Sequence, residues 1–411
     1  MISAVNHRPP LSGNNDLAMK GKFYFLLILI FCSKTQMTLS QPSSAKHTFR
    51  IGLFVPLYLD SAFDKNSTYR FPPKSFPKFS MPGLELVEGA FLAMDTLNKL
   101  KAPIELMVVD TRATAQSLLE QLKNASSQNL DLIITHCSTS ELQTIAAFGY
   151  EKNIPVVNIN LPNDAGVTNN PFLVLLNSTL RTQSIAIYNY VQTKFPKQPV
   201  VVFRKKGKLE DMIRGYWDET AKTNKSPQKW IYVDLPDSFT EDHLISKLDT
   251  IRQTICIAGS LDEAFGKKLV LHLATLSKQR YKSTIVGMPT WDAIREFSKP
   301  EFRGVDIIFC TPYYNDRTDS VSQQVQRFFI NTLYARPSDL ALRGYEAVWR
   351  FSRLLMRYGN GINSQLAANE FDLFREIQIH PVFSTDKQLQ YFENKKLYFF
   401  KWQYGILKLL P

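Results

Sequence analysis

The sequence predicts an α/β protein built on parallel β-sheets that are covered by helices. Four short apolar runs, FRIGLFVP, IELMVVD, DLIITHC and IPVVNIN, fall between residues 49 and 160 and alternate with helix-like segments. Each run is rich in Val, Ile and Leu and stops at a polar or turn-forming residue, as strands do when helices cover both faces of their sheet. Open α/β sheets bind ligands at the carboxyl ends of their strands, so we expect the binding site at the polar residues that follow these runs.

The first half of the chain reads as strands and helices in alternation. The first strand, 49–57, precedes an aperiodic insertion at 60–82 that is rich in Pro and aromatic residues, and loops of this length are usually functional or mobile. An amphipathic helix follows at 83–100, since one face carries Leu84, Val87, Phe91, Met94 and Leu97. A second helix is expected at 114–126. The third begins with STSELQT, where Ser138 and Glu141 form the signature of a capping box.

The second half continues the same alternation as a second sheet, because one sheet of this width would be unusual. Helices are expected at 180–195 and 209–223, and strands at PVVVFRK, KWIYVDL, QTICIAG, STIVGMP and GVDIIFCTPYY. Residues 319–358 contain two long helical patterns, which Pro337 separates and Gly359 ends. The final segment, LQYFENKKLYFFKWQYGILKLL, predicts antiparallel strands at the edge of one sheet, with a turn at Glu393 and Asn394.

Composition excludes several classes of protein. A length of 411 residues exceeds one ordinary core and predicts two lobes, and 44% hydrophobic with 21% charged residues indicates a folded protein. The net charge of +12 is spread along the chain, and its densest cluster, RKKGK at 204–208, follows an apparent strand as a solvated loop would. A nucleic-acid surface needs a basic face with interleaved aromatic residues, so no nucleic-acid partner is expected.

The first 40 residues read as a signal peptide. Lys20 and Lys22 precede an apolar run at 23–31 that is too short to span a bilayer, and the small residues Thr38 and Ser40 suit cleavage before Gln41. Met19 is an alternative start of the protein, with residues 1–18 misassigned, since a complete signal peptide opens at Met19.

Cys32 offers an alternative fate for the exported chain. It follows the apolar run as the lipid-anchored cysteine of a bacterial lipoprotein does, but the bulky Phe31 precedes it where a small residue is usual. We therefore expect a soluble exported protein, with membrane attachment only if Cys32 is lipidated.

The remaining cysteines, Cys137, Cys256 and Cys310, each end an apolar run and are expected to be buried thiols. An odd number implies no disulfide framework. The sequence has no Cys-x-x-Cys pair and no histidine cluster at ligand spacing, so neither a metal site nor a cofactor is expected.

Taken together, the ordered segments from 49 to 411 resemble the type I periplasmic binding protein fold, and specifically the branched-chain amino-acid (Leu/Ile/Val) binding family of ABC transporter substrate-binding proteins. The matching segments are IGLFVPL, GLELVEGAFLAMDTLN, LIITHCSTSELQTIA, IPVVNINLP, IVGMPTWDA, GVDIIFCTPYYND and LRGYEAVWRFSRLL. Within them, Gly83, Gly89 and Ala93 fit a G-x-x-x-x-x-G-x-x-x-A pattern loosely, residues 137–140 fit a small-residue turn, and GYEA at 344–347 fits a late helix.

The resemblance implies two Rossmann-like lobes joined by three crossovers that close on a ligand in the cleft between them. On that map, lobe one is 49–177 plus 318–375, and lobe two is 178–317 plus 376–411. Closure would be a hinge motion stabilised by contacts that form only in the closed state.

The resemblance also implies where the ligand would bind. The turn HCSTS places Ser138, Thr139 and Ser140 at a helix amino terminus, where backbone N–H groups and the helix dipole suit a carboxylate. The alternative is that Ser138 only caps its own helix. In the next turn, Asn158, Asn160 and Asn163 supply amides, although Leu161 and Pro162 occupy part of the expected turn.

The acid that the family would place near the first crossover is missing. Asn177, Ser178 and Arg181 occupy that segment, so a ligand ammonium group would lack its natural partner there, and an unpaired buried charge is costly.

The second lobe supplies further candidates from the loops that should face the cleft. They are Lys205, Ser260, Met288, Thr290 and Trp291. Trp291 suits either stacking on a ligand or packing inside the lobe. Tyr313 and Tyr314 lie near a crossover, where packing is favoured over contact with a ligand.

An enzyme is not expected. His136 and Cys137 are adjacent on a strand and so point to opposite faces, which places the imidazole badly for activating the thiol. The chain has no G-x-S-x-G elbow, P-loop or G-x-G-x-x-G after a strand.

We therefore expect an exported bacterial protein of the periplasm or cell envelope that reversibly binds a small polar or amino-acid-like ligand, for transport or sensing. Its partner would be an ABC permease or an envelope protein. The alternative is an envelope interaction or regulatory module on the same scaffold that has lost small-molecule binding.

Overall fold

The structure is a computed structural model that describes residues 47–72 and 75–411. The expected signal peptide and Cys32 lie outside the described residues. Within them, no helix has both the length and the apolar character needed to cross a membrane.

The first sheet has seven strands in the order β11-β12-β5-β4-β3-β1-β2. Its five parallel strands are β1 (Phe49–Val55), β2 (Ile104–Asp110), β3 (Leu132–Thr135), β4 (Val156–Asn158) and β5 (Leu173–Leu175). At one edge, the antiparallel pair β11 (Ile379–Phe383) and β12 (Leu389–Asn394) joins the sheet through a parallel pairing of β12 with β5. The four runs identified in the sequence are therefore neighbouring strands of one sheet.

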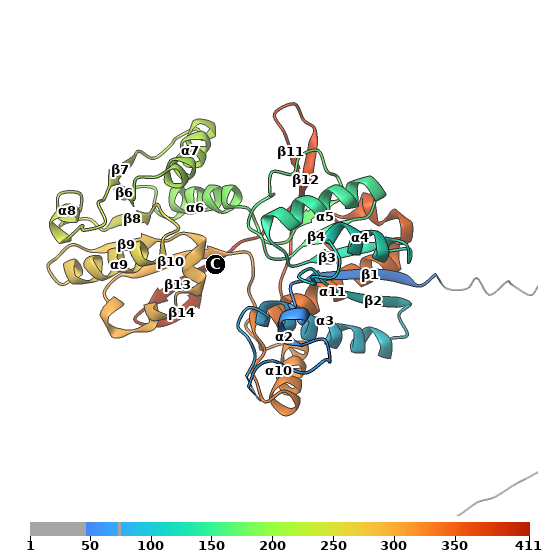
Figure 1. Cartoon of the computed structure of the whole chain (residues 1–411). Helices are drawn as coiled ribbons and strands as arrows, with labels where there is room; N and C mark the ends of the chain where they lie inside the picture. The colour runs from blue at the N-terminus through green and yellow to red at the C-terminus, as the bar shows by residue number, and fades with distance from the viewer. Residues whose placement is uncertain (1–46, 73–74) are drawn as a thin grey trace, which may run out of the picture. The chain divides into compact units, whose positions relative to one another are not determined.

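Helices cover both faces of this sheet because successive residues of a strand point to opposite sides. Ile51 and Leu53 of β1 pack against α3 (Met81–Lys99) and α11 (Asp339–Tyr358), whereas Phe54 packs against α4 (Leu118–Ser126) and α5 (Thr139–Lys152). Figure 1 shows α5 and α4 on one side of β3 and β4, with α3 and α11 on the other. A short helix α2 (Leu59–Ala62), the helix α10 (Ser320–Thr332) and the 3-10 helix η4 (Gly359–Gln365) complete this lobe.

Two glycines bring α3 and α11 into close contact. A Cβ atom on Gly89 would lie 1.8 Å from the carbonyl oxygen of Ala341, and one on Gly344 would lie 2.3 Å from that of Leu86. The backbones of the two helices therefore touch at these positions, which explains why glycine stands there on two well-packed helices.

The second sheet also has seven strands, in the order β14-β13-β10-β9-β8-β6-β7. They are β6 (Val200–Arg204), β7 (Trp230–Asp234), β8 (Thr254–Ala258), β9 (Ser283–Val286), β10 (Asp306–Thr311), β13 (Tyr398–Gln403) and β14 (Ile406–Leu409). The first five are parallel, and the hairpin β13–β14 is antiparallel to β10. One face packs on α6 (Leu180–Lys194) and α7 (Lys208–Thr223), and the other on α9 (Glu263–Ser277) and three 3-10 turns: η1 (Pro289–Ala293), η2 (Arg295–Ser298) and η3 (Pro300–Phe302). The short helix α8 (Glu241–Ile245) contacts α9.

The chain passes between the two sheets three times: at 176–179, at 312–319 and at 395–397. The predicted fold class is therefore confirmed: two α/β lobes with mostly parallel sheets, joined by three crossovers. Strands β11 and β12 lie in the first sheet, however, whereas the sequence analysis placed everything after residue 375 in the second lobe.

The predicted turn at Glu393 and Asn394 is wrong, because these residues end β12 and lead into the third crossover. Both side chains are buried, and they bond to the first crossover. The backbone N–H of Thr179 donates to Glu393 Oε1 at 2.7 Å, and Ser178 Oγ donates to the carbonyl of Asn394 at 2.6 Å. Buried polar groups need such partners, so the residues that resembled a solvated turn instead fasten two crossovers together.

Two of the four cations in the basic cluster at 204–208 pair with neighbouring acids. Arg204 is buried and pairs with Asp211 at 2.6 Å and with Asp234 at 2.7 Å. Lys205 pairs with Asp262 at 2.8 Å and Asp237 at 3.2 Å. The side chains at the start of this cluster are therefore already paired within the second lobe.

Candidate functional site

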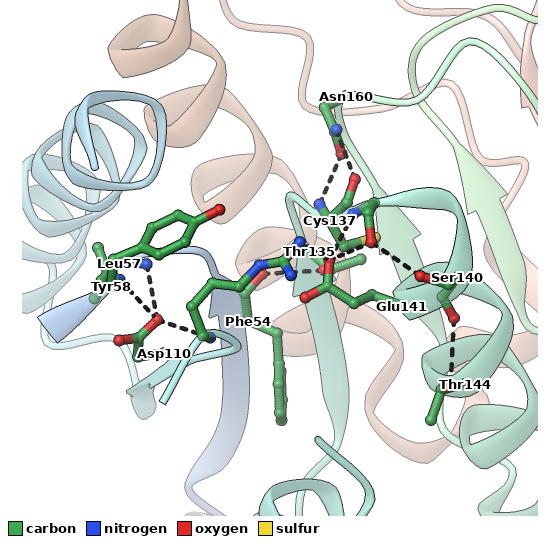
Figure 2. A network of polar contacts seen from close by, with 12 residues as sticks. Phe54, Leu57, Tyr58, Asp110, Thr135, Cys137, Ser140, Glu141, Thr144 and Asn160 are labelled. Carbon is green, nitrogen blue, oxygen red and sulfur yellow. Dashed lines mark hydrogen bonds and ion pairs between the residues drawn. The ribbon is translucent and has the colours of Figure 1, made fainter. Parts of the chain in front are cut away.

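The helix amino terminus that was expected to bind a ligand carboxylate already holds a carboxylate of the protein. Ser138 is the N-cap of α5, and both its backbone N–H and its Oγ donate to Glu141, at 2.7 and 2.6 Å. Arg112, from the loop after β2, donates to the same carboxylate oxygen at 3.1 Å. Figure 2 shows Glu141 near Cys137, at the end of the strand that carries Thr135.

The neighbouring donor of the same turn is occupied as well. The N–H of Cys137 donates to Asn160 Oδ1 at 3.0 Å, and Asn160 Nδ2 returns a bond to the carbonyl of Cys137 at 2.9 Å. Asn158 is fully buried, donates to Asn160 at 3.1 Å and accepts from the N–H of Leu161 at 2.9 Å. The structure thus brings Ser138, Asn158 and Asn160 together as an internal network that satisfies its own polar groups.

The other predicted residues of this lobe differ in their surroundings. Thr139 and Ser140 are exposed at the start of α5, where the hydroxyl of Ser140 lies 3.3 Å from that of Ser138. Asn163 is exposed, and its side chain accepts from the N–H of Ala165 at 3.0 Å in a local turn.

The first strand's loop is held at the same edge by Asp110. Its carboxylate accepts from the backbone N–H groups of Leu57 and Leu59, each at 2.8 Å, and from those of Tyr58 and Arg112 at 3.1 and 3.0 Å. This side chain, labelled in Figure 2, anchors the beginning of the aromatic insertion to the sheet.

The candidates of the second lobe are mostly interior. Ser260 is fully buried and donates to Glu210 at 2.7 Å, and Met288 is buried in the core. Trp291 is fully buried against Gly287, Gly266 and Phe297, so its ring packs inside the lobe and has no face free to stack on a ligand. Thr290 alone of the predicted ligand-binding residues lines one of the described cavities.

Two adjoining cavities lie where the second crossover meets α11. The first, of about 300 Å³, is called here the hinge cavity; it is lined by residues of η1, the crossover, α11, the 374–377 segment and β13. The second, of about 500 Å³, adds Pro162, Asn177, Glu263 and Thr290. The residues that line both are Asp292, Arg295, Pro312, Tyr313, Asp339 and Arg343.

Tyr313 and Arg343 line both cavities and contact each other. The hydroxyl of Tyr313 donates to the carbonyl of Ile159 at 2.6 Å, which joins the second crossover to the end of β4. The Arg343 guanidinium lies 3.6 Å from the centre of the Tyr313 ring, within the range of a cation–π contact. Tyr313 therefore both packs at the second crossover and lines the two cavities.

Two carboxyl groups face the hinge cavity in a poorly solvated setting. Burial raises the pKa of Asp292, whose nearest bond is from Thr311 Oγ1 at 3.3 Å. Burial likewise raises the pKa of Glu346 to about 7, an increase that Arg350 and Arg343 oppose. Sequence reasoning missed both acids as site residues, although Glu346 lies within the GYEA segment that carried the resemblance.

The thiol and imidazole of the HCSTS turn are unsuited to catalysis. Burial raises the pKa of the Cys137 thiol to about 12, so the thiolate that a nucleophile requires is strongly disfavoured. Burial lowers the pKa of His136, and its Nδ1 has no hydrogen-bond partner in the described residues. The residues that the structure describes contain no cluster of His, Cys, Asp and Glu that could hold a metal ion.

Comparison with known proteins shows what the chain resembles. No protein-family model matches the sequence, and no curated protein matches it. Among solved structures, a putative branched-chain amino acid ABC transporter protein from Rhodospirillum rubrum superposes with a TM-score of 0.64 at 13% identity, over 89% of this chain and 100% of its own.

Two further structures give similar values. An ABC transporter substrate-binding protein from Desulfitobacterium hafniense has a TM-score of 0.57 at 11% identity, over 88% of this chain and 99% of its own. Haemophilus influenzae LpoA has a TM-score of 0.55 at 14% identity, over 89% of this chain and 59% of its own. These likenesses establish the type I periplasmic binding protein fold for this chain.

Proposed function

We propose that this protein is an exported solute-binding protein that reversibly holds a small polar or amino-acid-like ligand between its two lobes, for transport or sensing. The observation that carries the proposal is the pair of cavities at the second crossover, which are lined by charged side chains from both lobes. Ligand sites of α/β proteins gather at such junctions, where a few polar groups fix the ligand's orientation. The fold supports the proposal, since two of the structures it resembles are named as proteins of ABC transporters.

The division into lobes is part of this proposal. Following the sheets, the first lobe comprises 49–177 with 318–394, and the second 178–317 with 395–411. Ligand contacts would come from the residues that line the cavities, Thr290 among them, and from the exposed Thr139 and Ser140 once the lobes close. A reversible binder needs no catalytic group, in keeping with the raised pKa of Cys137.

Export to the periplasm or cell envelope follows from the sequence of residues 1–40, with Cys32 as the point of attachment if it is lipidated. An ABC permease or an envelope protein would then be the partner of the ligand-bound form.

A second candidate function is favoured by one specific observation. Glu141 fills the position that a ligand carboxylate would take at the amino terminus of α5. A scaffold whose anion receptor is closed in this way could serve instead as an envelope interaction module that no longer binds small molecules.

The two functions are separated by thermal unfolding of the protein against amino acids, short peptides, nucleosides and muropeptides. A ligand that binds only the folded state stabilises it by about 2.7 kcal/mol at a hundredfold excess over its dissociation constant. A shift of the midpoint with one chemical class supports a solute-binding protein. If no class shifts it, the interaction module is the better description.

A further inference from the structure

Arg343 is a half-buried cation for which the described residues provide no anionic partner. The side chain projects from the first turns of α11 and lines both cavities. Within the described residues its guanidinium donates no hydrogen bond and makes no ion pair, and its buried Nε has no partner. Arg350, two turns further along the same helix, also has an unpartnered Nε, but its terminal nitrogens bond to Asp372 and to the carbonyl of Ala368.

An unpaired guanidinium at a cavity wall is costly unless something completes its bonding. A buried donor without a partner destabilises the folded protein, and the cost is greater when the donor is charged. Tyr313 holds the centre of the guanidinium 3.6 Å from the centre of its ring, but a ring face does not replace an oxygen acceptor for the N–H groups. The edge of the guanidinium fork therefore remains available to a planar acceptor.

We propose that Arg343 binds the carboxylate of the ligand in these cavities. This inference rests on the proposed solute-binding function and deepens it. It identifies the charged group that the ligand must carry and the residue that binds this group. It also explains how the protein recognises an anion although Glu141 and Asn160 occupy the donors of Ser138 and Cys137.

The neighbouring charges favour a singly charged carboxylate over a phosphate. Most other ionic side chains around the hinge cavity are paired: Arg317 with Asp339 at 2.8 Å, Arg375 with Asp316, and Glu376 with Lys396 at 2.6 Å. Besides Arg343, this leaves the exposed Arg295 and the two acids Asp292 and Glu346 outside ion pairs of the described residues. Asp292 and Glu346 repel any anion in the cavity, and the repulsion of a doubly charged phosphate is stronger than that of a singly charged carboxylate.

The two acids make binding depend on pH. Glu346 is faced by Arg350 and Arg343 of its own helix and by Asp372 of the adjoining segment, and Asp292 by Arg343, Asp339 and Arg295. A bound anion disfavours the charged forms of Glu346 and Asp292, so these carboxyl groups take up protons when the ligand binds. Because burial places the pKa of Glu346 at about 7, the affinity for a carboxylate should fall as the pH rises through that value.

The test compares ligands that differ only in the carboxylate. Pairs such as leucine and leucinamide, or hexanoate and hexanamide, are added to the wild type, to Arg343→Gln and to Arg343→Lys, and binding is measured by thermal shift and calorimetry. The matched control is Arg353→Gln, since Arg353 lies on the same helix and stacks on Trp349 and Phe371, at 5.4 and 5.0 Å, but lines neither cavity. Unfolding without ligand verifies that each variant is folded.

We expect the acid of a pair to bind the wild type and Arg353→Gln, and its amide to bind neither. Arg343→Gln should weaken binding by about tenfold or more, with Arg343→Lys between the two because it keeps the charge and loses the fork. Replacing Glu346 by Gln should flatten the pH dependence.

Three outcomes would overturn the inference. If amides bind as tightly as acids, or if Arg343→Gln binds acids as the wild type does, Arg343 is not the anion receptor although solute binding stands. If no acid, no amide and no neutral metabolite shifts the wild type, and formate stabilises it no more than chloride at equal ionic strength, both the inference and the proposed function fail.

Discussion

Replacing Glu141 with Ala tests whether the amino terminus of α5 is an anion site that the protein fills itself. The substitution removes the acceptor of the Ser138 N–H, the Ser138 hydroxyl and Arg112 in a single step. Because Glu141 is only 9% exposed, water replaces these bonds poorly.

The expected cost is about 3 kcal/mol of unfolding free energy. Loss of a capping interaction accounts for about 1 kcal/mol, and a hydrogen bond to a charged group for about 1.5–3 kcal/mol. The value for a charged hydrogen bond is counted only once, for Ser138. The bond from Arg112 adds little, because this side chain is 37% exposed and water can replace its lost partner.

A matched control exists on the neighbouring helix. Glu120 forms the same capping box with Ser117, whose N–H and Oγ donate to it at 2.8 Å each, but it is exposed and no arginine of residues 47–72 or 75–411 pairs with it. Urea unfolding followed by circular dichroism should show Glu141→Ala to be destabilised well beyond Glu120→Ala. Formate should then stabilise Glu141→Ala more than it stabilises the wild type, because it can occupy the vacated position. Equal costs for the two substitutions, together with no added effect of formate, would refute the argument.

Three further outcomes follow from packing and charge. Gly89→Ala should destabilise the protein by about 2 kcal/mol or more in urea unfolding, since the new Cβ has no space beside Ala341. The control, Gly215→Ala, should stabilise α7 by about 0.5–1 kcal/mol, because nothing lies within 4 Å of a Cβ there. Trp291→Ala should cost about 3–5 kcal/mol in the same assay without changing ligand affinity, and a loss of affinity at unchanged stability would place the ring in the site instead. The wild type should lose stability as the pH rises from the ordinary value of 4.5 to about 7, because folded Glu346 holds its proton more tightly than the unfolded chain does, and Glu346→Gln should lack that slope in pH-dependent unfolding.

The fold was largely predictable because its signals are local. Strands β1 to β4 are apolar runs with clear ends, and the Ser138–Glu141 box begins α5 as the spacing indicates. These features depend on neighbours in the sequence, so the chain reveals them without its partners.

The errors arose where partners are distant. Glu393 and Asn394 have the composition of a turn, but the first crossover supplies bonds that bury them. The capping box was visible in the sequence, whereas the contact from Arg112, 29 residues away, was not. Arg343 carried no local signal either, since its importance comes from the bonds it lacks once α11 meets Tyr313.

The interleaving of the two sheets has a consequence for how the chain is made. Strand β5 pairs with β12, and Val174 lies opposite Phe392 in that pairing. The edge of the first sheet at β5 therefore stays unpaired until the segment with Phe392 has been synthesised. A chain that emerges from its amino end must hold an incomplete, apolar sheet edge while the five parallel strands of the second sheet are produced. Long-range pairing of this kind is slow, and exposed edges invite aggregation. The fold therefore depends on late completion: a truncation that removes only the last forty residues would leave both sheets open, not one.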